Sequence, residues 1–163
     1  MRTYWNTTGG LNNIEPQNKN CWIQVTCPTE DDKEYLENVI KIPDYYLSDI
    51  ADIDERARYE IDEGWILIIL RIPYAKEVPS RTPFNTIPLG IIFNKDVCIT
   101  VCYYETNMMI DFITHHQKRA VGFTDTVDMV FRLFLSSSVW YLKRLKQISG
   151  LIEKSKRNLD RKV

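Results

Sequence analysis

The sequence lacks most of the patterns that mark an enzyme or a nucleotide-binding protein. Its 163 residues contain only six glycines, and none of these falls in a Walker, dinucleotide-binding or nucleophile-elbow pattern. The only two histidines, His115 and His116, are adjacent on an expected helix, so their side chains diverge and cannot chelate one ion together. We therefore expect one surface histidine, one half-buried histidine and no enzymatic activity, because the residues supply no closed set of metal ligands or catalytic groups.

Cysteines and long apolar runs are also scarce. The four cysteines form no Cys-x-x-Cys pair and the N-terminal residues carry no secretory signal, so we expect small buried thiols rather than disulfides or zinc ligands. The longest apolar run is Trp65–Leu70, six residues long, whereas a membrane-spanning helix needs about 20 apolar residues. We expect that these 163 residues do not themselves cross a membrane.

The net charge is only −1, but the charges are unevenly distributed. Residues 141–163 carry eight basic and two acidic side chains, a balance of +6, so residues 1–140 hold −7. Aromatic residues are mixed with acids, which disfavours a stacking platform for nucleic acid. The pattern favours contacts with other subunits of the same protein or with cations, although two simply solvated faces explain it as well.

An acidic helix begins the most informative stretch, residues 42–73. Pro43 suits the first helical turn, and Asp44 suits the positive end of the helix dipole. Apolar side chains recur at three- and four-residue spacing and predict a buried stripe, formed by Tyr46 or Leu47 with Ile50 and Ile53. Asp49 and Asp52 fall on the opposite face, where we expect both carboxylates to point to solvent one turn apart. Such a face is either a cation-binding surface or a polar surface that only keeps the helix soluble.

A strand pair follows this helix. Residues 58–62 alternate polar and apolar, Glu63 and Gly64 form a turn, and Trp65–Leu70 is apolar at every position. A continuous apolar run bounded by a turn is typical of a strand that is covered on both faces. We therefore expect this strand to be central in its sheet.

The other elements of residues 1–122 follow from local patterns. We expect a first hairpin of Arg2–Asn6 with Leu11–Glu15, a strand over Cys21–Thr26, a loop over Ala75–Pro83, and a second hairpin of Thr86–Phe93 with Val97–Tyr103, closed by Asn94 in a left-handed conformation. Two further helices are expected, one capped by Thr29 with core residues Tyr35, Leu36, Val39 and Ile40, and one capped by Thr106 or Asn107 and ending near Lys118.

From Thr124 onward the pattern changes to one long helix. Its seam residues step by three and four, as in a coiled coil: Phe131, Phe134, Ser138, Tyr141, Leu145, Ile148, Ile152, Ser155 and Leu159. Forty helical residues extend about 60 Å, so we expect the helix to project from the sheet domain, with Gly150 marking either a bend or the end of order. We divide the chain into an α/β domain, residues 1–122, and the start of a long helical region, residues 123–163. The partner of the seam is expected after Val163 or in another subunit.

The acidic helix and the strand pair together resemble the cytoplasmic domain of CorA-type divalent metal ion transporters. The stretch reads IPDYYLSDIADIDERARYEIDEGWILIILRIP, and the likeness continues in the family's order at Cys21–Val25, Pro28–Asp31, Ile87–Phe93 and Ile99–Val101. The resemblance implies an α/β fold, namely an α/β/α sandwich with a mixed β-sheet between helices, followed by a long projecting C-terminal helix. It also implies a stalk and two transmembrane helices beyond Val163, which place the protein in the cell (inner) membrane with this portion in the cytoplasm.

The function that the resemblance implies is the gating of a Mg²⁺ and Co²⁺ channel. In this family, soluble domains sense intracellular Mg²⁺ at the interfaces of a homopentamer and hold the pore closed when the ion is plentiful. One regulatory ligand is an aspartate in a Leu-x-Asp-Ile context, which Leu47–Ile50 matches, so the resemblance assigns a regulatory metal half-site to Asp49. Asp52 is a second candidate. Ser48 stands where some members carry another acid, and the partner ligand and the pore residues are expected outside this sequence.

Two alternatives stay open beside this interpretation. A related zinc transporter would share the soluble architecture and differ in the ion that it carries. A free-standing interaction module would instead use the C-terminal helix to bind another protein.

Overall fold

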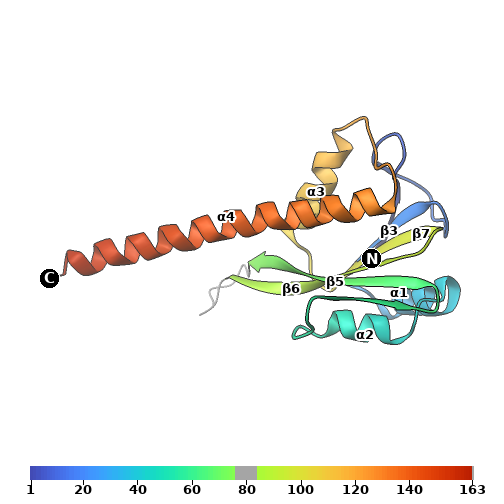
Figure 1. The fold of residues 1–163 in the computed structure, drawn as a ribbon, viewed down its shortest axis with the longest axis horizontal. Coiled ribbons are helices and arrows are strands. Elements are labelled where there is room, and N and C mark those ends of the chain that lie inside the picture. The colour runs from blue at the N-terminus through green and yellow to red at the C-terminus, as the bar shows by residue number, and fades with distance from the viewer. Residues whose placement is uncertain (76–83, 163) are drawn as a thin grey trace.

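The computed structural model describes residues 1–75 and 84–162, which fold around one seven-stranded sheet with helices on both faces (Figure 1). The strands are β1 (Arg2–Asn6), β2 (Asn12–Asn13), β3 (Cys21–Thr26), β4 (Arg58–Asp62), β5 (Trp65–Ala75), β6 (Phe84–Phe93) and β7 (Val97–Cys102), in the spatial order β2-β1-β3-β7-β6-β5-β4. Neighbouring strands are antiparallel, except that β3 and β7 are parallel. The predicted mixed-sheet sandwich is confirmed, whereas residues 76–83 of the predicted loop over Ala75–Pro83 lie outside the described residues.

The helices form one layer on each face of the sheet. They are α1 (Glu30–Glu34), the π-helix η1 (Tyr35–Ile40), α2 (Tyr45–Ala51), α3 (Asn107–Gln117) and α4 (Thr126–Asp160). On one face η1 and α2 bury Leu36, Tyr46 and Ile50 against the sheet. On the other face α3 and α4 bury Phe112 and Leu133. The view of Figure 1 shows these two layers above and below the strands.

Three hairpins build most of the sheet, as predicted. Gly9 and Gly10 turn the chain between β1 and β2, and Glu63 and Gly64, with φ of 51° and 82°, form the tight turn between β4 and β5. Between β6 and β7 the side-chain oxygen of Asn94 accepts the N–H groups of the second and third residues after it, at 2.8 and 3.0 Å. The predicted left-handed conformation of Asn94 is wrong, because this side-chain bonding closes the turn instead.

Strand β5 is an interior strand but not the central one. It lies between β6 and the edge strand β4, and the middle position belongs to β7, whose six residues are all buried. Leu67 and Ile69 are buried in the layer of α2, and Ile68 and Leu70 pack half-buried in the opposite layer. The predicted central position is wrong because an apolar run indicates which faces of a strand are covered, not how many strands lie beside it.

The first helical segment begins at the predicted cap and then changes its winding. The Thr29 hydroxyl accepts the N–H of Asp32, and the Asp32 carboxylate accepts the N–H of Thr29, which together form a capping box. The chain continues as the π-helix η1, in which Leu36 is fully buried. Val39, predicted in the core, is 54% exposed, because the wider turn of a π-helix moves it off the face that a 3.6-residue period assigns to it.

Helix α2 packs closely on the sheet but ends early. Tyr46, Leu47 and Ile50 are buried as predicted, whereas Ile53 is 39% exposed. The prediction for Ile53 is wrong because the helix ends at Ala51 and the backbone of the next residue is already extended. The close approach of α2 to β6 depends on Gly90, since a Cβ at that position would lie 2.2 Å from Ile50 Cδ1.

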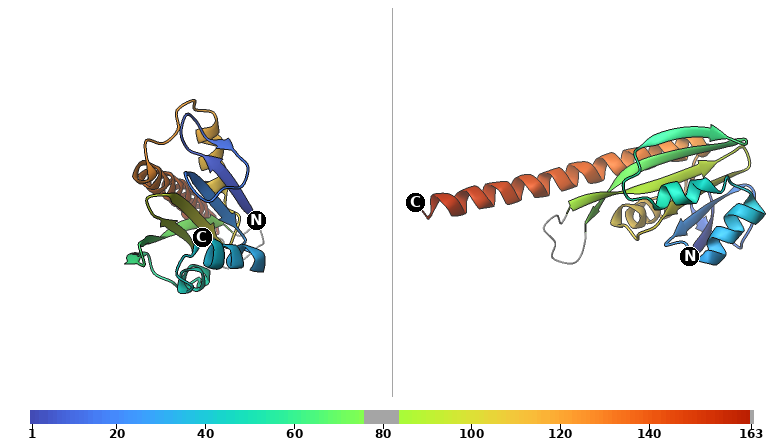
Figure 2. Two further views of the ribbon diagram at one scale, coloured as in Figure 1. Left: turned by 90° about the vertical axis from the view of Figure 1, so that its right-hand side faces the viewer. Right: turned by 90° about the horizontal axis from the view of Figure 1, so that it is seen from below.

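Helix α4 projects far beyond the sheet, as predicted (Figure 2). Its first turns pack on the domain through Met129, Val130, Leu133 and Ser137, and farther along Tyr141 donates a hydrogen bond to the carbonyl of Arg71 at 2.8 Å. Phe131, predicted in the seam, is 64% exposed. This part of the helix packs on the sheet domain and not on a coiled-coil partner, so a different face of the helix is buried. The helix continues through Gly150 to Asp160, so the predicted end of order at Gly150 is wrong. Among the helices of residues 1–75 and 84–162, none is both long and apolar enough to span a bilayer.

Candidate metal half-site

Asp49 lies on the outer side of α2 and is paired with an arginine. Its carboxylate Oδ2 is 2.5 Å from Nη2 of Arg58, the first residue of β4, and the side chain is 29% exposed. The expectation of a carboxylate that points freely to solvent is therefore corrected. The pair forms because the chain leaves α2, turns back, and starts β4 beside the helix that precedes it.

Arg58 is the centre of a small charged cluster. Its Nε lies 3.2 Å from Glu55 Oε1 and its Nη1 lies 2.5 Å from Glu60 Oε2, in addition to the contact with Asp49. One guanidinium thus faces three carboxylates, and the side chains of all four residues are between 23% and 32% exposed. The cluster keeps an excess of negative charge at the surface, which attracts cations.

Tyr45, in the first turn of α2, extends this cluster. Its hydroxyl lies 2.6 Å from Glu60 Oε1 and 2.6 Å from Asp62 Oδ2. Hydrogen bonding to Asp62 and Glu60 raises the pKa of Tyr45 well above its usual value. The Tyr45 hydroxyl and then the Arg58 guanidinium lower the pKa of Glu60, so this carboxyl stays ionised in mild acid.

Asp52 is the C-terminal cap of α2. It is the residue after the end of α2, with φ −74° and ψ 110°, and its side chain is exposed. The carboxylate accepts the N–H of Asp54 at 2.9 Å and thereby stabilises the turn that leaves the helix. The Asp52 N–H still donates to the carbonyl of Ser48 at 3.2 Å, so this residue keeps its place one turn after Asp49, and its exposure agrees with the prediction.

The geometry matches part of a cation site rather than a complete one. Among residues 1–75 and 84–162, no group of three or more His, Cys, Asp or Glu side chains is arranged to hold a metal ion. Asp49 can offer one oxygen to a hydrated Mg²⁺, an ion that proteins often hold through one or two carboxylates while it keeps several waters. A cation at this oxygen has to compete with Arg58.

The cysteines and histidines lie away from this cluster. Cys21, Cys98 and Cys102 are buried and free, as predicted, and burial raises the pKa of Cys102 to about 11. Cys27 is exposed, which corrects the prediction for that residue, because it stands just past β3 where the chain leaves the sheet. His115 is exposed as predicted, whereas His116 is buried rather than half-buried, because its ring packs on Phe112 and Phe123. Its Nδ1 lies 2.7 Å from the carbonyl oxygen of Phe112.

Sequence reasoning missed Arg58 as a partner of Asp49. Arg58 comes nine positions after Asp49, and the pairing depends on how the connection between α2 and β4 folds. Arg71 of β5 helps to fix that connection, because its guanidinium donates to the carbonyls of Ile53 and Glu55. Only the composition of the segment hints at this pairing, because Arg58 is one of few basic residues between Glu30 and Glu63, a segment rich in acids.

Comparison with known proteins agrees with the fold. The family model described as "CorA-like Mg2+ transporter protein" matches residues 17–163. No curated protein sequence matches the chain. The complete CorA magnesium transporter from Methanocaldococcus jannaschii is similar, with a TM-score of 0.80 and 17% identity over 98% of this chain and 51% of that one.

Two soluble domains are also similar in structure. The soluble domain of CorA from Methanocaldococcus jannaschii has a TM-score of 0.78 and 16% identity, over 98% of this chain and 64% of that one. The ZntB cytoplasmic domain from Vibrio parahaemolyticus has a TM-score of 0.71 and 12% identity, over 93% of this chain and 63% of that one. The chain thus has the fold of these domains and spans about half the length of the complete magnesium transporter.

Proposed function

This chain belongs to the CorA-like Mg²⁺ transporter family, and from that premise we propose that it is the cytoplasmic, cation-sensing domain of a divalent metal ion transporter. The proposed cargo is Mg²⁺ and Co²⁺, and the complete protein is proposed to be a homopentamer in the cell (inner) membrane. The role of this domain is regulatory and not enzymatic. The family match over residues 17–163 carries the proposal.

The Asp49 half-site supplies a mechanism for sensing. When Mg²⁺ is scarce, Arg58 neutralises Asp49 within the domain. When Mg²⁺ is plentiful, the hydrated ion takes the Asp49 carboxylate, and a second ligand comes from a neighbouring subunit, while Arg58 keeps its contacts with Glu55 and Glu60. An ion held between two subunits stabilises the arrangement in which they are close, so rising Mg²⁺ favours one state of the assembly, proposed to be the closed pore.

The likeness to the ZntB cytoplasmic domain favours a second candidate, a zinc transporter with the same soluble architecture. Ion flux separates the two. The complete protein, reconstituted in vesicles, is expected to pass Mg²⁺ and Co²⁺ faster than Zn²⁺. Faster Zn²⁺ flux selects the second candidate, and no flux of any of the three ions contradicts the proposed transporter.

A further inference from the structure

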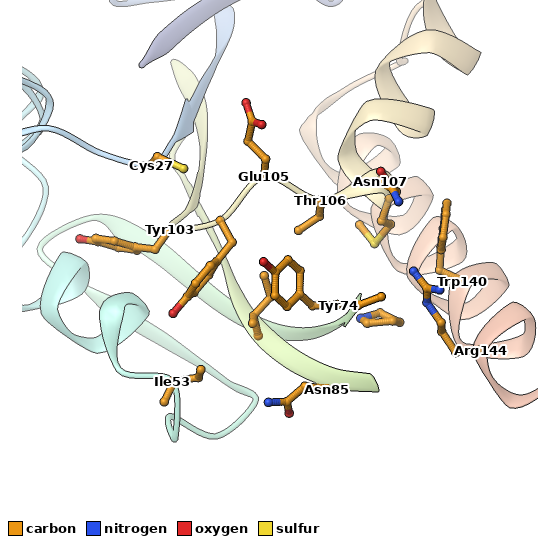
Figure 3. Close-up of a pocket in the computed structure, with 15 residues that line it drawn as sticks. Cys27, Ile53, Tyr74, Asn85, Tyr103, Glu105, Thr106, Asn107, Trp140 and Arg144 are labelled. Carbon is orange, nitrogen blue, oxygen red and sulfur yellow. The ribbon is translucent and has the colours of Figure 1, made fainter. Parts of the chain in front are cut away.

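A cavity of about 820 Å³ opens at one end of the sheet (Figure 3). Its walls come from the residues that directly follow β3 and β7, from Ile53 just after α2, from the end of β5 and the start of β6, and from the middle of α4. Cys27 follows β3, and Tyr103, Tyr104 and Glu105 follow β7. The cavity therefore lies outside the carboxyl ends of the two parallel strands.

The topology of the sheet makes this position a preferred one for a ligand. After β3 the chain passes to α1, η1 and α2 on one face, and after β7 it passes to α3 and α4 on the other. Two adjacent parallel strands whose connections leave to opposite faces form a topological switch point. In open α/β sheets, ligands bind in the crevice that such a divergence creates at the carboxyl ends of the strands.

Arg144 of α4 gives the cavity a cationic wall. Its Nη1 donates to Gln147 at 2.9 Å, and its guanidinium lies 5.2 Å from the ring centre of Trp140. None of the ion pairs formed by residues 1–75 and 84–162 includes Arg144, and its Nε is buried with no hydrogen-bond partner among those residues. The guanidinium charge therefore has no carboxylate partner among the described residues, and an anionic group in the cavity would supply one.

The rest of the cavity supports a negative ligand. Glu105 is the one carboxylate among the described lining residues, and Figure 3 shows it directed away from the space that Arg144 enters. The first turn of α3 also lines the cavity through Thr106, Asn107 and Met108, and a helix N-terminus carries partial positive charge. Figure 3 shows Asn107 and Arg144 on the same side of the cavity, from facing helices.

Aromatic rings form the opposite part of the wall. Tyr74 and Tyr104 have ring centres 5.4 Å apart, and Tyr103 also lines the cavity. The Tyr103 hydroxyl is held by the carbonyl of Leu47 at 3.2 Å, so that ring is fixed in place. Planar rings bind well against such faces, because flat aromatic surfaces pack with little loss of side-chain freedom.

We propose that this cavity, between the tyrosines that follow β7 and Arg144 of α4, binds a small organic anion with a planar aromatic ring and one phosphate or carboxylate group. The ring lies against Tyr74 and Tyr104, and the anionic group accepts hydrogen bonds from Arg144. None of Asp49, Glu55, Arg58 and Glu60 lines this cavity, so the site adds a second, organic ligand to the domain.

Calorimetric titration of the chain with four probes tests this proposal. AMP offers a ring and a phosphate, indole-3-acetate a ring and a carboxylate, adenosine a ring alone, and ribose 5-phosphate a phosphate alone. We expect AMP or indole-3-acetate to bind about tenfold or more tightly than adenosine and ribose 5-phosphate, and the tighter of the two identifies the anionic group. No binding of either below about 10 mM, or equal binding of the ring-less phosphate, overturns the proposal.

Two variants locate the binding. Arg144→Gln is expected to lower the affinity for the bound anionic probe by about tenfold or more, and Tyr104→Leu to lower it by a smaller factor. Arg157→Gln, on the exposed part of α4, is the control and should leave this affinity unchanged. Equal losses in Arg144→Gln and Arg157→Gln, with both variants folded by circular dichroism, would mean that the charge of α4 as a whole attracts the probe and would overturn the cavity as its site. This readout is independent of ion transport, so it fails or succeeds separately from the proposed function.

Discussion

Arg58 Nη2 lies 2.5 Å from Asp49 Oδ2, so the carboxylate nominated as a cation ligand already has a positive partner within its own domain. The partner is tied at its other nitrogens to Glu55 and Glu60, and it therefore stays in place when Asp49 exchanges it for an ion. In the proposed mechanism Arg58 sets the Mg²⁺ concentration at which the half-site responds. Competition of this kind lowers the affinity of the half-site for Mg²⁺, although the Asp49 carboxylate stays available as a ligand.

Removal of Arg58 is expected to strengthen Mg²⁺ binding. In Arg58→Gln three carboxylates lose their shared counter-charge. The more negative surface should lower the Mg²⁺ concentration for half-saturation several-fold, which corresponds to about 1 kcal/mol of binding free energy. An Mg²⁺ titration of the chain, followed by NMR at the amides of α2, measures the change. Arg56→Gln, which removes an exposed charge two residues away, is the matched control, and equal effects of both variants would indicate general electrostatics in place of competition at Asp49.

Gly90 is expected to be the least replaceable glycine of the sheet. An added Cβ would lie 2.2 Å from Ile50 Cδ1 and 2.6 Å from its Cγ1, so Gly90→Ala should lower the free energy of unfolding by about 1–3 kcal/mol. Urea unfolding gives this value directly. The second substitution Ile50→Val, which removes the closest carbon, should restore part of the loss; a double variant no more stable than Gly90→Ala would place the strain elsewhere.

Gly150 provides the opposite case on α4. A Cβ there meets nothing within 4 Å, and the residue is inside a continuous helix, so Gly150→Ala should raise helix stability by up to about 1 kcal/mol. Thermal melting followed by helical circular dichroism tests it. A lower melting temperature would show that the helix uses this glycine as a bend in solution.

His116 is expected to make the stability of the domain depend on pH. Burial lowers its pKa below the usual value of 6.5, and the charges of His115, Arg132 and Arg119 act in the same direction. Because the unfolded chain binds this proton more readily, the free energy of unfolding should fall as the pH is lowered through about 6.5 toward the depressed folded pKa. Above about pH 6.5 the histidine is neutral in both the folded and the unfolded chain, so its contribution to the unfolding free energy is present in full.

His116→Phe isolates the contribution of that histidine. The variant keeps a ring beside Phe112 and Phe123 and removes the titrating group, so its unfolding free energy should vary less between about pH 7 and pH 5 than that of the wild type. Parallel pH profiles of the two proteins would show that other groups cause the dependence.

The local elements were predictable because their signals are local. The Glu63-Gly64 turn, the Thr29 cap and the projecting α4 follow from residues that are neighbours in sequence, and all three are confirmed. Where the chain departs from regular winding, periodicity fails. The π-turn displaces Val39, and the early end of α2 exposes Ile53.

Contacts between distant segments were the part that the sequence could not supply. The apolar run of β5 does not reveal that β4 is an edge strand. The side chains of a strand indicate which of its faces are covered, and they do not indicate how many strands lie beyond its neighbour. The pairing of Asp49 with Arg58 depends on the path of the chain between α2 and β4. The family resemblance pointed to Asp49, but only the structure shows what holds that carboxylate.

The most direct test of the account is the Mg²⁺ sensitivity of gating in the complete transporter with Asp49→Asn. The proposed half-site requires an ionised carboxylate, so the variant should need a higher Mg²⁺ concentration, by about tenfold, to reduce ion flux by half, while Asp111→Asn on the other face of the domain leaves this concentration unchanged. If flux in Asp49→Asn closes at the same Mg²⁺ concentration as in the wild type, Asp49 is not the sensor.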